Sequence, residues 1–71
     1  MKIGYLEDDA SHVERIQLIL ESAGHTCRAF GDGSLLIRDL KRERFDMLLL
    51  DWQVPGVTGH QVTIWVRTNL S

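Results

Sequence analysis

Acidic residues follow two separate apolar segments of this 71-residue chain. Glu7 and Asp8 come directly after the short run 2–6, and Asp51 comes directly after the apolar run 45–50. If both runs are neighbouring strands of a parallel sheet, their carboxyl ends lie at one edge, where ligand-binding groups of such sheets gather. Carboxylates brought together there repel one another and need a cation. An all-oxygen cluster with room for water suits Mg²⁺, so the sequence predicts a magnesium site at this edge.

The elements that must position these acids alternate along the chain. The spacing of apolar residues predicts strands over 2–6, 26–30 and 45–50 and helices over 10–23, 35–40 and from 59 onward. Strands that alternate with helices form a parallel sheet with right-handed crossovers. Each strand–helix–strand unit needs about 30 residues. The length of 71 residues therefore holds three strands of a single α/β domain.

Local signals indicate where the helices begin and how deep the third strand lies. Segments 11–14 and 58–61 both fit a capping box, in which a hydroxyl and a side chain three residues later bond each other's backbone N–H groups. Asp32 or Ser34 can cap the second helix, and Asp9 is interpreted as a helix cap or loop residue rather than a ligand. On the helix 10–23, Val13, Ile16, Leu20 and Ala23 share one face, which Ile19 widens, and Gly24 ends it. The continuous apolar run before Asp51 predicts a strand buried on both faces.

Composition and charge exclude several classes of protein. The chain is 44% apolar and 25% charged with a net charge of -2, which is typical of a globular domain. The basic segment 41–44 is interrupted by an acid and is interpreted as a solvated helix end rather than a nucleic-acid surface. A single cysteine, Cys27, allows no internal disulfide and is compatible with the reducing cytoplasm, where we expect the protein. No signal peptide or membrane span is expected, and His12, His25 and His60 are expected on the surface.

The segments around the acids resemble the receiver domain of bacterial two-component response regulators. Leu6-Glu7-Asp8-Asp9 is similar to the acidic pair after the first strand of that family, and residues 48–59 are similar to its phosphoacceptor segment, with a Pro-Gly turn and a downstream glycine. Gly24-His25 and residues 31–33 match the family at the two ends of its second strand. The resemblance covers all 71 residues. It implies the flavodoxin-like receiver fold, truncated to βαβαβα, with parallel strand order 2-1-3.

The resemblance also implies a role for each acidic residue. Asp51 is expected to be the phosphoacceptor, taking a phosphoryl group from a sensor histidine kinase; the chain is then a signalling module and not an enzyme. Asp8 and Asp51 are expected to bind Mg²⁺ directly, the backbone carbonyl of Gln53 to complete the protein ligands, and Glu7 to act through a water. The family's later hydroxyl and lysine residues are expected beyond residue 71. A DNA-binding output domain in the full-length protein would be its only contact with nucleic acid.

Two other functions compete with this interpretation. The chain could be a truncated or degenerate receiver that acts only in protein association. In the order 2-1-3 the strand over 47–50 becomes an edge, and an apolar edge pairs readily with another chain, so we expect a homo-oligomer formed through that edge or by exchange of elements. An aspartate-nucleophile phosphatase is disfavoured, because Gln53 stands where a second acid is expected. Trp52 either covers the site in part or only packs, and Trp65 is expected in the core or an interface.

Overall fold

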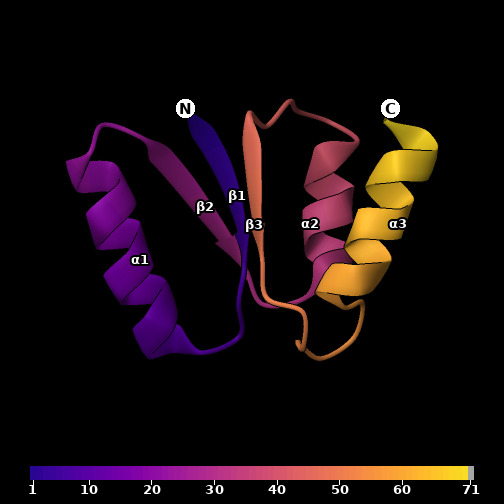
Figure 1. Ribbon diagram of the computed structural model, residues 1–71, viewed down its shortest axis with the longest axis horizontal. Coiled ribbons are helices and arrows are strands. Elements are labelled where there is room, and N and C mark those ends of the chain that lie inside the picture. The colour runs from indigo at the N-terminus through magenta and orange to yellow at the C-terminus, as the bar shows by residue number, and fades with distance from the viewer. Residues whose placement is uncertain (71) are drawn as a thin grey trace.

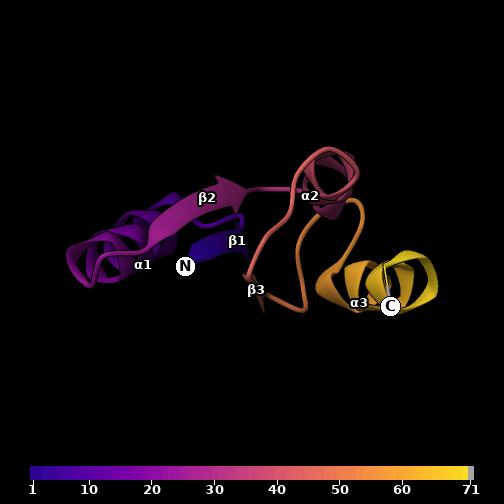
Figure 2. The same cartoon turned by 90° about the horizontal axis from the view of Figure 1, so that it is seen from above.

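A three-stranded parallel sheet forms the middle of the molecule in the computed structural model, which describes residues 1–70. The elements are β1 (Lys2–Leu6), α1 (Ala10–Ser22), β2 (Thr26–Phe30), α2 (Gly33–Leu40), β3 (Met47–Leu50) and α3 (Gly59–Asn69). The strand order is β2-β1-β3. Helix α1 lies on one side of the sheet, and α2 and α3 lie on the other (Figures 1 and 2). The predicted α/β architecture and strand order are confirmed.

The register of the strands aligns the ends of the sheet. Leu6 pairs with Phe30 on one side and with Leu50 on the other. Hydrogen bonding continues one residue further, because the Glu7 N–H donates to the Phe30 carbonyl and the Asp51 N–H donates to the Leu6 carbonyl, both at 2.9 Å. Glu7 and Asp51 therefore leave the sheet side by side at the same edge.

The main hydrophobic core lies between the sheet and the α2/α3 layer. Its buried residues are Leu6, Phe30, Leu36, Leu40, Val54 and Val62. Trp65 and Val66 of α3 pack against this core, so the expectation that Trp65 lies in the core or an interface is confirmed. Burial of apolar area here supplies the main stabilisation, at roughly 25 cal/mol per Å². No helix within residues 1–70 is long and apolar enough to cross a membrane.

Helix α1 begins one residue before the predicted capping box, so that box is wrong. Asp9 is the N-cap, and its Oδ1 accepts from the N–H of Ser11 at 2.9 Å and of His12 at 3.3 Å. Ser11 lies inside the first turn and donates its hydroxyl to the same oxygen. A carboxylate at the cap also interacts favourably with the helix dipole, which explains why Asp9 starts the helix. At the other end Gly24 has φ +91°, and the helix stops at residue 22 rather than 23.

The apolar stripe of α1 is narrower than predicted. Val13, Ile16 and Leu20 are half-buried, but Ile19 is 56% exposed and Leu18 is 67% exposed. No residue of α1 is fully buried. The helix packs mainly against β2. The face that carries Leu18 and Ile19 is therefore not covered by any other part of residues 1–70.

Strand β3 is shorter and more exposed than predicted. The strand begins at Met47, because residues 45 and 46 turn into the sheet: Phe45 packs against the core, and Asp46 exchanges hydrogen bonds with Lys2 through its N–H and carboxylate. Met47 is 45% exposed, and the other three residues are half-buried. Among the described strands only β1 pairs with β3. The prediction of burial on both faces is therefore wrong, whereas the predicted edge position is confirmed.

Candidate functional site

Three acidic side chains gather at the carboxyl edge of the sheet. Glu7, Asp8 and Asp51 each offer a carboxylate oxygen, and these oxygens all lie within 4.8 Å of one another. Side chains alternate between the faces of a strand, which places Glu7 and Asp51 on the same face. The cluster lines an open depression of about 480 Å³ beside α1. The predicted convergence of these three residues is confirmed.

Asp51 is held by its own backbone and by the loop that follows. Its N–H bonds the Leu6 carbonyl, which fixes the Cα position next to β1. Its Oδ1 accepts from the Gln53 N–H at 3.1 Å, so one carboxylate oxygen has a fixed direction. Asp51 is half-buried and Gln53 is exposed. The carboxylate is thus oriented and still accessible.

The loop between β3 and α3 is fastened to the start of α2 by Asp32. Oδ1 of Asp32 accepts from the N–H of Ser34 at 2.8 Å, which caps α2, and from the N–H of Val57 at 3.1 Å. These hydrogen bonds, that of Ser34 first, lower the pKa of Asp32. Gly33 adds a bond from its N–H to the Val57 carbonyl at 2.9 Å. Gly56 allows the tight approach, because it has φ +71° and a Cβ there would meet the Asp32 carboxylate.

The start of α3 lies directly against the backbone of Asp51. A Cβ on Gly59 would lie 2.4 Å from the Asp51 carbonyl oxygen, so only glycine fits without a shift. Thr58 and Gln61 form the predicted capping box: the Thr58 hydroxyl accepts from the Gln61 N–H, and the Gln61 side chain accepts from the Thr58 N–H. The cap fixes the first residue of the helix, and the glycine lets that residue touch the strand end.

Among the other residues that line the depression are Tyr5 and His12, which were not predicted as site residues from the sequence. Tyr5 is only 5% exposed and borders the depression; burial first, and then the negative charge of Glu7 and Asp51, raise the pKa of Tyr5. His12 borders it as well, with Nδ1 3.5 Å from Oε1 of Glu7. Tyr5 stands two residues before Glu7, and residues two apart in an extended segment share a face; this spacing was the available signal for the tyrosine. No such signal existed for His12, because its position next to Glu7 depends on the residue at which α1 begins.

Trp52 and the three histidines differ in how far their side chains are exposed to solvent. Trp52 is 53% exposed and stacks on His60 with ring centroids 5.2 Å apart, so it is a surface residue of the loop next to Asp51. His12 and His60 are exposed as predicted. His25 also lies at the surface, but it is half-buried, and its Nδ1 lies 2.9 Å from the amino group of Met1.

The chemistry of this cluster fits a hard divalent cation. All three donors are carboxylates, two half-buried and one exposed to solvent, which leaves room for water ligands. Mg²⁺ prefers oxygen ligands and keeps several waters. A carboxylate next to such an ion can also act as a nucleophile toward a phosphoryl group. The residues present therefore suit metal-assisted phosphoryl transfer.

The chain is similar in sequence to a known domain family and to known proteins. The family described as response regulator receiver domain matches residues 3–70. The DNA-binding response regulator MtrA of Mycobacterium tuberculosis is 33% identical over 68 residues, or 96% of this chain. The sensor protein GacS of Pseudomonas syringae pv. syringae is 31% identical over 62 residues, or 87% of this chain.

Solved structures agree with the sequence matches. The receiver domain of a sensor histidine kinase from Pseudomonas aeruginosa, which has a magnesium ion coordinated in its active site cleft, superposes with a TM-score of 0.91 and 28% identity over 97% of this chain. The chain spans 57% of that domain's structure, 30% of MtrA and 7% of GacS. Because the family match extends over almost all of its residues, the chain belongs to the response regulator receiver domain family.

Proposed function

We propose that Asp51 accepts a phosphoryl group from the phosphohistidine of a sensor histidine kinase. The observation that carries this proposal is the convergence of three carboxylate oxygens within 4.8 Å at the edge of a parallel sheet. Membership of the receiver family and the similarity to the sensor protein GacS support it. The site is open to solvent, as transfer between two proteins requires.

The transfer exchanges one bond to phosphorus for another. A carboxylate oxygen of Asp51 attacks the phosphorus, the P–O bond of an acyl phosphate forms, and the P–N bond to the kinase histidine breaks. The leaving imidazole nitrogen keeps the electron pair and takes a proton from solvent. The hydrogen bond from the Gln53 N–H to Oδ1 orients the carboxylate and leaves Oδ2 as the attacking atom.

We propose that the acidic cluster binds Mg²⁺ during this transfer. Asp8 and Asp51 would be direct ligands, Glu7 would act through a water, and the backbone carbonyl of Gln53 would complete the protein ligands. Bound Mg²⁺ would offset negative charge on the phosphoryl oxygens. The magnesium in the receiver domain from Pseudomonas aeruginosa supports this assignment.

Magnesium binding is tested by the fluorescence of Trp52, which is next to Asp51 and exposed. Addition of Mg²⁺ should change its emission, and saturation at about 100 times the Kd should stabilise the fold by about 2.7 kcal/mol. Asp51→Ala should abolish both effects. Glu14→Gln is the matched control, because it removes an exposed acid of α1 that lies outside the cluster. Equal Mg²⁺ responses in both variants would contradict the metal assignment.

Phosphorylation is tested separately with a phosphoramidate donor and intact-mass and peptide mass spectrometry. One base-labile phosphoryl group should appear, as expected of an acyl phosphate, and it should map to Asp51. Asp51→Asn should remain unlabelled, whereas Glu14→Gln should be labelled like the wild type. Labelling of another residue, or of Asp51→Asn to the same extent, would overturn the proposal.

The open edge of β3 favours a second function, association between copies of this chain. Pairing through β3, or exchange of elements, would cover Met47 and the unpaired backbone groups of an edge strand. Met47→Lys should shift sedimentation toward the monomer, because a charge on an edge strand opposes pairing. Leu35→Lys is the control, since Leu35 is 43% exposed on α2. A purely associative receiver would still dimerise after Asp51→Ala and would not be phosphorylated.

The full-length protein is proposed to act on DNA through another domain. MtrA is a DNA-binding response regulator, and this chain matches 30% of its length. The proposed location is the cytoplasm, because the single cysteine, Cys27, is a buried free thiol. Promoter binding by a full-length protein, with and without phosphorylation, tests the DNA-binding role.

A further inference from the structure

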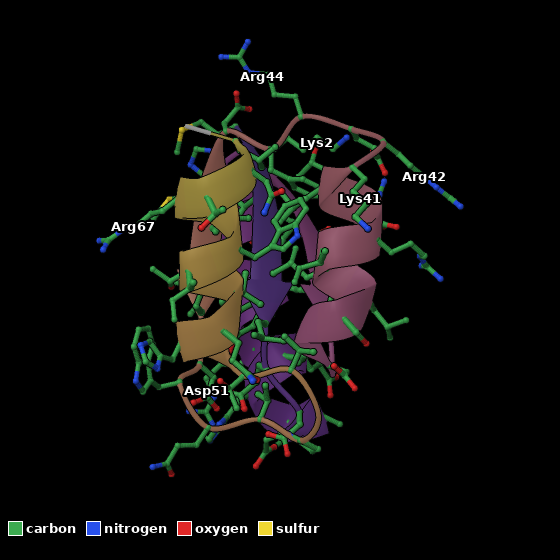
Figure 3. The ribbon with its side chains drawn as sticks, turned by 90° about the vertical axis from the view of Figure 1, so that its right-hand side faces the viewer. Lys2, Lys41, Arg42, Arg44, Asp51 and Arg67 are labelled. Carbon is green, nitrogen blue, oxygen red and sulfur yellow. The ribbon has the colours of Figure 1, made fainter. Side chains whose placement is uncertain are left out.

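The acidic cluster lies far from many of the basic side chains of the chain. Figure 3 shows, at the end of the molecule opposite Asp51, the side chains of Lys2, Lys41, Arg42 and Arg44. Within residues 1–70, no lysine or arginine lines the acidic depression. Carboxylates whose oxygens lie within 4.8 Å of one another repel, and hydrogen-bond donors or a bound cation must stabilise their charged forms.

Glu7 is the enclosed member of this cluster, with a side chain that is only 12% exposed. Its Oε2 accepts from the N–H of Asp9 at 3.3 Å, and its Oε1 lies 3.5 Å from Nδ1 of His12. Both contacts come from the start of α1, so they hold the carboxylate from the side of the helix. A charge this far from solvent needs polar partners, and the strand side of Glu7 must supply the rest.

Tyr5 lies on that strand side. It stands two residues before Glu7, on the same face of β1, and borders the depression next to the apolar side chains of Ile16 and Leu49. Residues 1–70 by themselves leave it only 5% exposed. Burial first, and then the negative charges of Glu7 and Asp51 and a hydrogen bond to Glu7, raise the pKa of Tyr5. Its hydroxyl is therefore a neutral donor next to the carboxylates.

We propose that Tyr5 is a positioning residue of the Mg²⁺ site, which acts through Glu7. Its hydroxyl donates to the Glu7 carboxylate and holds that group in the direction from which it accepts from a water on the ion. The inference rests on the proposed Mg²⁺ site, in which Glu7 acts through a water. Groups that hydrogen-bond the ligands of a metal ion orient them, and their loss weakens metal binding about 10- to 100-fold. The lower end applies here, because Glu7 does not touch the ion.

Replacement of Tyr5 by phenylalanine tests the hydroxyl, because the ring and its packing stay. The Kd for Mg²⁺, measured by Trp52 fluorescence, should rise about tenfold. Thr26→Val is the control, since it removes an exposed hydroxyl at the amino end of β2 and should leave the Kd unchanged. Urea denaturation without metal verifies that both variants are folded. Equal Kd values for Tyr5→Phe and the wild type would overturn the inference.

A double-mutant cycle on the Kd for Mg²⁺ decides whether Tyr5 acts through Glu7. In a Glu7→Gln background the carboxylate that the hydroxyl positions is absent, so Tyr5→Phe should change the Kd by less than about twofold. A tyrosine that only packs under α1 would change the Kd by the same factor in both backgrounds. Equal factors would therefore assign Tyr5 a packing role and refute the positioning role.

A measurement without metal uses the fact that Tyr5 is the single tyrosine of the chain. Tyrosine labelled with ¹³C at the ring carbon that bears the hydroxyl gives one nuclear magnetic resonance signal. Glu7→Gln should shift this signal, because the hydroxyl loses an anionic acceptor, whereas Glu14→Gln should leave it in place. An unshifted signal in Glu7→Gln would overturn the inference.

This signal also separates the inference from the proposed function. A wild-type chain that does not respond to Mg²⁺ would refute the metal site, and the metal-free signal would still decide whether Tyr5 holds Glu7. A wild-type chain that binds Mg²⁺ as tightly as Tyr5→Phe would leave the metal site standing and refute the role of Tyr5.

Discussion

Replacement of Gly59 by alanine tests whether the start of α3 is fixed by contact with the backbone of Asp51. A Cβ at this position would lie 2.4 Å from the Asp51 carbonyl oxygen and 3.2 Å from the Trp52 Cα, whereas ordinary contact begins at 3.4 Å. Both neighbours are backbone atoms, so no side chain can rotate away. The helix start and the strand end must therefore separate by about 1 Å.

The expected cost is the difference between two opposing effects. Overpacking in a well-packed region costs about 1–3 kcal/mol, whereas alanine favours a helix over glycine by up to about 1 kcal/mol. The net loss should be about 1–2 kcal/mol of unfolding free energy. For a domain of this size that lowers Tm by on the order of 10 °C. Displacement of Asp51 should also weaken Mg²⁺ binding in the proposed site.

Urea denaturation followed by circular dichroism measures the stability change. Gly31→Ala is the matched control, because Gly31 is exposed and a Cβ there has nothing within 4 Å. Its stability should stay the same or rise by about 0.4–1 kcal/mol through the lower entropy of the unfolded chain. If Gly59→Ala were as stable as Gly31→Ala, the close approach of α3 to Asp51 would be refuted.

Three other perturbations follow from single contacts. Hydrogen bonds from two backbone N–H groups lower the pKa of Asp32 below its ordinary 3.8; its stabilising effect is complete above pH 3.8 and is lost as the pH falls through the lower folded value. Asp32→Asn should therefore lose less unfolding free energy than the wild type when the pH is lowered. Identical pH profiles of the two proteins would count against this. Thr58→Ala removes the N-cap of α3 and should cost about 1 kcal/mol, against little change for Thr68→Ala, whose hydroxyl only bonds an exposed helix carbonyl; urea titration distinguishes them. Leu36→Ala should cost about 2–5 kcal/mol because Leu36 is fully buried, while Leu35→Ala, at a 43% exposed position, should cost much less; similar losses would contradict the assigned core.

The sequence by itself determined the order of elements and the edge at which the acids lie. Apolar spacing follows the helix and strand periods, so the ranges of β1 and β2 matched their predictions. The carboxyl ends of parallel strands lie at the same edge of a sheet. Glu7, Asp8 and Asp51 could therefore be predicted to lie together once the strand order was taken from the family resemblance. The capping box at Thr58 was likewise readable, because its two partners are three residues apart.

The tertiary structure decided the features that depend on residues distant in the chain. The run before Asp51 had the composition of a buried central strand, but β3 has only β1 as a described neighbour, so its exposure was set by the sheet and not by its own sequence. Asp9 caps α1, as one of its two sequence interpretations had it, but the approach of His12 to Glu7 depends on how α1 lies beside the end of β1. The contact between Gly59 and the Asp51 backbone joins a helix start to a strand end, and only the folded chain brings these two points together. The spacing of apolar residues determines whether a segment forms a helix or a strand. How deeply that segment is buried, and what it contacts, depends on the other elements that the fold places beside it.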